Sequence, residues 1–168
     1  MTDELTTQEP AASGFFYAPS VRIATEADTD ALVEMGRQFF ALTGCDDLAD
    51  FDVESFKATL AHLRTGDAVC LVAEVNGQVV GAAGALAYPF YFNAAHKTGQ
   101  EIFWWLNPEH RGGTLGGRLL IALEAWAREA GCKTFSMIAL DAVNPEEVGG
   151  MYKRRGYRAT EHSYIKEL

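Results

Sequence analysis

The chain has 168 residues, enough for one domain with a sizeable hydrophobic core. Hydrophobic residues make up 48% of it and charged residues 22%, which is ordinary for a soluble globular protein. The formal net charge of −9 argues against a nucleic-acid-binding surface, and no apolar run is long enough to cross a membrane. We therefore expect neither nucleic acid nor membrane as a partner.

Three cysteines, Cys45, Cys70 and Cys132, show neither a CxxC spacing nor a pairing with histidine. Such a set is typical of reduced thiols in a cytosolic protein. The first residues also lack the basic stretch and apolar run of a secretory signal. We therefore expect a cytoplasmic protein without a metal site.

Residues 1–20 mix Thr, Glu, Pro, Ala and Ser with a small aromatic cluster, Phe15-Phe16-Tyr17. We expect a flexible arm whose aromatic residues dock on the domain or on a second copy, so a homodimer is one expected assembly. Residues 21–168 are expected to form a single domain.

In that domain a short strand at 21–23 precedes a helix that begins near Thr25, where Asp28 follows three residues on. A second helix is predicted through 53–63. Two strands, 68–75 and 78–88, flank Asn76-Gly77, which is a strong signal for a type I′ hairpin.

The second half of the chain continues with a strand at 99–106 and a helix at 114–130 that ends at Gly131. A buried strand is predicted at 134–140. A short helix then begins at Asn144-Pro145 and ends at Gly156, and a final strand is predicted at 158–167.

The connection between the strand at 99–106 and the next helix carries four glycines within six residues, Gly112, Gly113, Gly116 and Gly117. Backbone N–H groups there are not shielded by side chains. The helix start adds unpaired N–H donors and the positive end of its dipole. Strand, glycine-rich loop and helix N-terminus together favour a bound phosphate or pyrophosphate.

Spacing separates three kinds of phosphate loop. A Walker loop ends in Gly-Lys-Ser/Thr, which Gly116-Gly117-Arg118 does not supply, and the glycines do not follow the Gly-x-Gly-x-x-Gly of a dinucleotide fold. The segment 106–116 resembles the acyl-CoA loop of the GNAT N-acetyltransferases, Arg/Gln-x-x-Gly-x-Gly/Ala, with Thr114 in place of the first motif glycine. Residues 151–157 resemble the Phe-Tyr-x-x-x-Gly-Phe segment of the same family.

This resemblance covers residues 20–168 and implies the fold. The GNAT fold is α+β, with a mixed, mostly antiparallel sheet of six to seven strands that is flanked by about four helices. Its sheet splays between the fourth and fifth strands, which leaves a slot for the pantetheine arm of the cofactor.

The resemblance also implies acetyl-CoA as co-substrate and a set of groups that bind it. Backbone groups for the pantetheine arm and amides for the pyrophosphate are expected from Trp104, Leu106, Arg111, Gly112, Gly113, Thr114, Leu115, Gly116 and Gly117. The side chain of Arg111 either reaches a phosphate or is solvated. Asn144 either contacts the cofactor arm or simply caps the helix that follows it.

Two residues are candidates for proton transfer. Tyr152 matches the tyrosine that protonates the departing CoA thiolate in relatives, and a phenol with a pKa near 10 needs little tuning for this. The other interpretation of Tyr152 is a core aromatic. Glu101 is the candidate general base, with an exposed strand residue as the alternative, and water alone suffices in many relatives.

The expected activity is transfer of an acetyl group from acetyl-CoA to a primary amine of a small molecule or a protein, by direct attack in a ternary complex. The alternative is a catalytically weak CoA-binding domain that serves as a sensor or assembly component. The aromatic segments 39–51 and 88–92 and their neighbouring acids suit a cationic amine, but they equally suit a cover for the core or a dimer contact.

Overall fold

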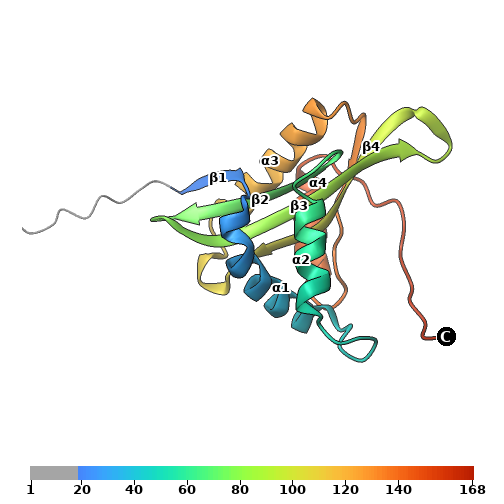
Figure 1. Ribbon diagram of the computed structural model, residues 1–168. Helices are drawn as coiled ribbons and strands as arrows, with labels where there is room; N and C mark the ends of the chain where they lie inside the picture. The colour runs from blue at the N-terminus through green and yellow to red at the C-terminus, as the bar shows by residue number, and fades with distance from the viewer. Residues whose placement is uncertain (1–18) are drawn as a thin grey trace, which may run out of the picture.

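A five-stranded sheet forms the centre of the molecule, and its strands lie side by side in chain order, β1-β2-β3-β4-β5 (Figure 1). The computed structural model describes residues 19–168, so nearly all of the expected N-terminal arm lies outside the described residues. The strands are β1 Ser20–Ile23, β2 Ala68–Val75, β3 Gln78–Phe90, β4 Asn93–Leu106 and β5 Thr134–Ser136. Neighbouring strands are antiparallel except for β4 and β5, which are parallel.

Helices cover both faces of this sheet (Figure 1). The helices are α1 Thr29–Thr43, α2 Val53–His62, α3 Leu115–Glu129 and α4 Pro145–Arg154, with short 3-10 turns at Glu26–Asp28 and Pro108–His110. These elements confirm the predicted α+β class with a mixed, mostly antiparallel sheet. The described part of the chain has five strands where six to seven were expected.

Two apolar clusters hold the layers together, one on each face of the sheet. On one face Leu32 and Met35 of α1 and Leu60 of α2 pack against Phe103 and Trp105 of β4. On the other face Leu115, Leu119 and Leu123 of α3 pack against small and branched residues of β2 and β3. The 4-residue spacing of these α3 leucines is the pattern of one buried helix face.

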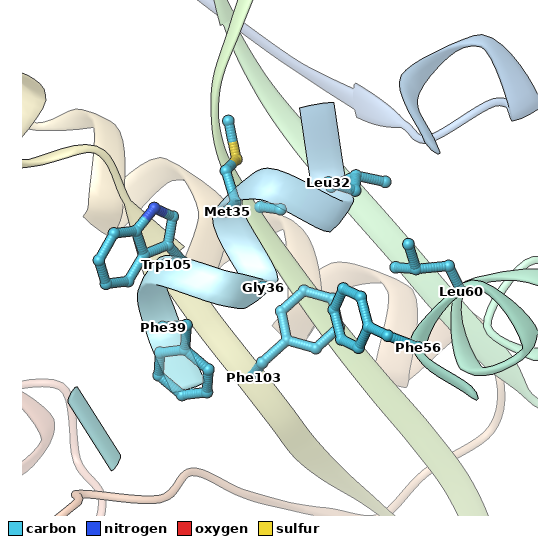
Figure 2. A pocket seen from close by; sticks show the side chains of 9 residues that line it. Leu32, Met35, Gly36, Phe39, Phe56, Leu60, Phe103 and Trp105 are labelled. Carbon is cyan, nitrogen blue, oxygen red and sulfur yellow. The ribbon is translucent and has the colours of Figure 1, made fainter. Parts of the chain in front are cut away.

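The cluster under α1 and α2 contains a cavity of about 20 Å³, which Figure 2 shows. That volume suffices for about one water molecule, but the lining is apolar apart from the Trp105 indole, whose N–H already donates to Asn107 Oδ1 at 3.0 Å. Gly36 lies where the two helices approach, since a Cβ at that position would come within 2.3 Å of the Phe56 ring. The cavity is a packing defect of the core.

The hairpin between β2 and β3 forms as predicted, because Asn76 (φ 52°) and Gly77 (φ 77°) both adopt the positive φ of a type I′ turn. The predicted strand at 134–140 ends at Ser136. The strand predicted at 158–167 is wrong, because residues 157–168 have no regular secondary structure and the chain end leads away from the fold (Figure 1). Within residues 19–168, no helix combines the length and the hydropathy that crossing a bilayer requires.

Candidate functional site

β4 and β5 run together for a short distance and then separate. The last residue pair joins Gln100 of β4 to Ser136 of β5, while β4 continues to Leu106. Residues 101–106 therefore have no strand partner on the β5 side among residues 19–168. The predicted splay between the fourth and fifth strands is confirmed, and it leaves backbone groups of β4 free to bond an extended ligand.

A β-bulge at Ile102 decides which side chains face this gap. Phe103 pairs with Gly84 and Glu101 pairs with Ala85, so Ile102 is an extra residue on β4. The bulge shifts the alternation of β4 by one residue. Glu101 and Trp104 consequently lie on the same face of the sheet, the one covered by α3.

Glu101 is buried in the gap, with 4% of its surface exposed. The backbone N–H of Ile138, just beyond β5, donates to its Oε2 at 3.0 Å. Burial raises the pKa of this carboxyl to about 7, and the single hydrogen bond offsets only part of the desolvation. The interpretation of Glu101 as an exposed strand residue is wrong.

Tyr152 of α4 is also buried, and like Glu101 it bonds to the backbone of Ile138. Its hydroxyl donates to the carbonyl oxygen of Ile138 at 2.9 Å, and its ring lies 6.2 Å from that of Trp104 and 5.7 Å from that of Tyr157. Burial, and then the charge of Glu101, hold the pKa of Tyr152 well above its usual range. The pKa of this phenol is therefore not the ordinary value near 10 that the sequence suggested, because the side chain is buried.

The glycine-rich loop leads into α3, whose first helical residue is Leu115. Thr114 precedes it at the N-cap position, but its side chain makes no capping hydrogen bond. The backbone N–H groups of the first turn therefore remain available as donors. Gly112 has φ 78°, which favours glycine. A Cβ at Gly113 or Gly117 would meet nothing within 4 Å, so the outer surface of the loop is open.

The indole of Trp104 forms the floor of this loop, because a Cβ at Gly116 would lie 3.1 Å from its ring. Within residues 19–168, its buried Nε1 has no hydrogen-bond partner. A buried polar group without a partner is costly. This site fits a phosphorylated cofactor that carries further acceptor groups, because it offers open amides, a helix N-terminus and an indole N–H without a partner in the described part of the chain.

Two other predicted cofactor residues are occupied by contacts within the protein. The guanidinium of Arg111 lies 4.5 Å above the Trp105 ring, and its Nε donates to the carbonyl oxygen of Leu106 at 2.8 Å. Arg111 therefore ties the loop to the end of β4 and remains exposed to solvent, so a contact with a phosphate stays a prediction. The carbonyl of Leu106 is engaged by the same bond.

Asn144 precedes α4 in a left-handed conformation (φ 43°), and its side chain makes no capping hydrogen bond. The interpretation as a side-chain cap is wrong. Its exposed position leaves the cofactor-contact alternative as a prediction.

The two aromatic segments expected to select the acceptor differ in structure. Phe51 packs between Phe40 and Phe56, so the aromatic part of the first segment covers the core, whereas Asp46, Asp47 and Asp50 are exposed. In the second segment Tyr91 and Phe92, each 79% exposed, stack at 4.2 Å on the tip of the β3–β4 hairpin.

Sequence reasoning missed Ile138, which joins Glu101 to Tyr152. It contributes backbone atoms only, so its residue type carries no signal. The side chain of Trp104 was also missed, although a large aromatic two residues before the strand end was a usable indication of a floor beneath the glycines.

Known proteins resemble this chain over most of its length. A family model described as the acetyltransferase (GNAT) family matches residues 36–157. The chain is 29% identical over 147 residues to an aminoglycoside N(6')-acetyltransferase type 1 from Stenotrophomonas maltophilia, a match that covers 86% of this chain and 89% of that protein.

Solved structures show the same fold. The structure of AAC(6')-Iy in complex with the bisubstrate analogue CoA-S-monomethyl-acetylneamine superposes with a TM-score of 0.72 at 14% identity, covering 90% of this chain and 99% of that chain. A predicted acetyltransferase from Clostridium acetobutylicum, solved with acetyl-CoA, gives a TM-score of 0.68 at 21% identity, with coverage of 90% and 97%.

Proposed function

The chain belongs to the GNAT acetyltransferase family, and on that premise we propose that it transfers an acetyl group from acetyl-CoA to a primary amine of a small cationic acceptor. The observation that carries this proposal is the juxtaposition of Glu101 and Tyr152 at Ile138, where β4 and β5 separate. Two buried proton-transfer groups at one end of a slot suit an acyl transfer that needs one proton removed and another supplied.

Glu101 is the proposed general base. A carboxyl with a pKa of about 7 is part ionised at neutral pH, and its ionised form is basic enough to take a proton from an ammonium group. The bulge at Ile102 supports this role, because it turns Glu101 toward the slot instead of toward α1 and α2.

Tyr152 is the proposed general acid. In the described structure its hydroxyl proton points to the Ile138 carbonyl, so protonation of a leaving sulfur requires an exchange of that hydrogen bond. The raised pKa of the phenol keeps it protonated and makes the phenolate a strong base. Its proton is therefore recovered readily after each turnover.

The amides of residues 112–117 and the indole N–H of Trp104 are the proposed cofactor donors. When bound, acetyl-CoA supplies the activated acetyl thioester that an amine attacks. The role of the protein is to hold that group beside β4, to orient the amine and to keep water out of the buried gap.

We take the acceptor to be an amine of an aminoglycoside type. Support comes from the curated relative, which is named for that substrate class, and from the charge of the chain. A net charge of −9 and exposed acids at 46, 47 and 50 favour the approach of a polycation.

The test is release of CoA thiol from acetyl-CoA with a panel that contains neamine, a simple alkylamine and a peptide with a free N-terminus. We expect turnover with neamine, at a rate that increases as pH rises through about 7. The Glu101→Gln variant should be roughly 10²-fold slower and should not show this pH dependence. Binding of CoA without turnover of any amine would instead support a sensor or assembly role.

A further inference from the structure

α4 carries Tyr152, yet the helix itself does little to fix where that residue lies. It has ten residues, and Tyr152 is its one buried residue. Two adjacent glycines, Gly149 and Gly150, occupy its middle, where each costs about 1 kcal/mol of helix propensity relative to alanine. A short helix of this composition is marginal alone, so contacts with other elements must set the position of Tyr152.

Those contacts gather just after the helix, around the carboxylate of Glu124 on α3. The Tyr157 hydroxyl donates to its Oε1 at 3.1 Å, and the Arg155 guanidinium lies 3.5 Å from the same oxygen. The Glu124 side chain is 17% exposed, so little solvent competes for these bonds. Burial and the Glu124 charge raise the pKa of Tyr157 well above its usual range, so its hydroxyl remains a donor at neutral pH.

Tyr157 connects this carboxylate directly to Tyr152. The rings lie 5.7 Å apart, and the Tyr157 N–H donates to the Tyr152 carbonyl at 3.1 Å. α3 is in turn held on the sheet by Leu115, Leu119 and Leu123, and its first turn belongs to the glycine-rich loop. The path from Glu124 through Tyr157 to Tyr152 therefore runs from the helix of the phosphate loop to the proposed acid.

We propose that Glu124 and the Tyr157 hydroxyl are positioning residues for Tyr152, which together fix its phenol relative to the cofactor loop. The inference rests on the proposed acid role of Tyr152. The family segment has phenylalanine where this chain has Tyr157, so the hydroxyl that makes the bond to Glu124 departs from that segment.

The experiment compares turnover of Tyr157→Phe, Glu124→Met and Glu124→Gln in the full chain. Tyr157→Phe keeps the ring and removes the donor, and Glu124→Met keeps the length and removes the acceptor. We expect each to lower kcat by about 3- to 10-fold, the range of one net hydrogen bond, with KM for acetyl-CoA almost unchanged. The amide oxygen of Glu124→Gln still accepts from Tyr157, so this variant should recover most of the loss.

The decisive measurement is a double-mutant cycle with Tyr152→Phe. If the hydroxyl of Tyr157 acts through Tyr152, then Tyr152→Phe with Tyr157→Phe should be no slower than Tyr152→Phe alone. Arg128→Gln is the matched control, because Arg128 contacts the outer oxygen of the same carboxylate at 3.4 Å and is 71% exposed. It should have wild-type kcat.

The outcomes separate the two proposals. Independent, multiplying losses in the double variant would overturn the positioning role and show a merely structural one. A slow Tyr152→Phe with wild-type Tyr157→Phe and Glu124→Met would overturn the positioning role alone. Wild-type turnover by Tyr152→Phe would overturn the acid role and the present inference with it.

Discussion

Glu101 and Trp104 face the same side of the sheet although three positions separate them along β4, because Ile102 is an extra residue in the ladder. Without the bulge, Glu101 would share the face of Phe103 and Trp105, in the cluster under α1 and α2. One inserted residue thus places a carboxylate in the gap between β4 and β5 and not in a hydrocarbon core.

The ionisation of Glu101 should weaken the fold. Burial raises its folded-state pKa from 4.5 to about 7, so the favourable contribution of the protonated form is complete below pH 4.5 and is lost as pH rises through 7. The shift corresponds to roughly 3 kcal/mol as an upper bound. In urea unfolding, Glu101→Gln should have a higher free energy of unfolding than wild type at pH 8. The difference between the two proteins should be larger at pH 8 than at pH 4.5. An equal difference at both values would contradict the buried, raised carboxyl.

A carboxylate at position 117 should weaken cofactor binding without harm to the fold. A Cβ there meets nothing within 4 Å, and a carboxylate in the first turn of α3 interacts favourably with the positive end of the helix dipole. Repulsion of a pyrophosphate should reduce CoA affinity about tenfold or more. Calorimetric titration of Gly117→Asp against the isosteric Gly117→Asn isolates the charge. Equal affinities for the two variants would place the pyrophosphate elsewhere. Gly116 is a poorer choice, because its Cβ would press on Trp104.

Thr114→Gly restores the family glycine and should leave CoA affinity unchanged or improved. The Thr114 side chain makes no capping bond, and the change from Thr to Gly at an N-cap costs only a few tenths of a kcal/mol, so the melting temperature should fall slightly. Titration with CoA and a thermal melt check both statements. A large loss of affinity would show that the hydroxyl donates to a phosphate.

Tyr152→Phe should lower kcat by roughly 10²–10⁴-fold, the usual range for a positioned proton donor. CoA affinity should stay near the wild-type value, because the ring that contacts Trp104 is retained. The Ile138 carbonyl loses its donor, so unfolding free energy should fall by about 1 kcal/mol. Steady-state kinetics with thioesters of more acidic thiols provide the control, since these need the acid less and should lose less rate.

Acid should destabilise the N-terminal part of the domain through Asp28. Arg22 donates to both oxygens of Asp28, at 2.8 and 2.9 Å, and these bonds hold the pKa of the carboxyl well below its usual range. The stabilisation is present above about pH 4, where unfolded aspartate ionises, and is lost as pH falls further.

Asp28→Asn should therefore lose roughly 2–4 kcal/mol at pH 7 and clearly less at pH 2.5, where aspartate in the unfolded chain is largely protonated. Unfolding curves at pH 7 and pH 2.5 provide the check. A constant gap between the two proteins would show that the charge is not what Arg22 recognises.

Local signals in the sequence predicted what local backbone chemistry decides. Asn76-Gly77 fixed a turn because few other residue pairs accept two positive φ values, and both residues show them. The glycines at 112–117 predicted the loop because they leave backbone N–H groups unshielded, and Gly112 also adopts a positive φ.

Features that depend on long-range pairing were not readable. The bulge at Ile102 arises from the register between β3 and β4, and nothing in Glu101-Ile102-Phe103 specifies it. The strand predicted at 158–167 does not form, and β5, the edge strand that precedes it in the sequence, has only three residues and offers few backbone bonds. The burial of Glu101 depends on this bulge, so the residue type alone could not separate a buried base from an exposed strand residue.

In the described part of the chain, the separation of β4 from β5 leaves β5 paired to the rest of the sheet over three residues only. Beyond the three residue pairs of β4 and β5, the contacts that join β5 and α4 to the rest of the molecule include the bond from the Ile138 N–H to Glu101 and the contacts of Tyr152 and Tyr157. A change in the width of this gap would move Glu101 and Tyr152, the proposed proton-transfer groups, relative to one another. Substitutions far from the reacting atoms, at the strand ends or in the chain after α4, can therefore change the rate of the enzyme by changing the distance between β4 and β5.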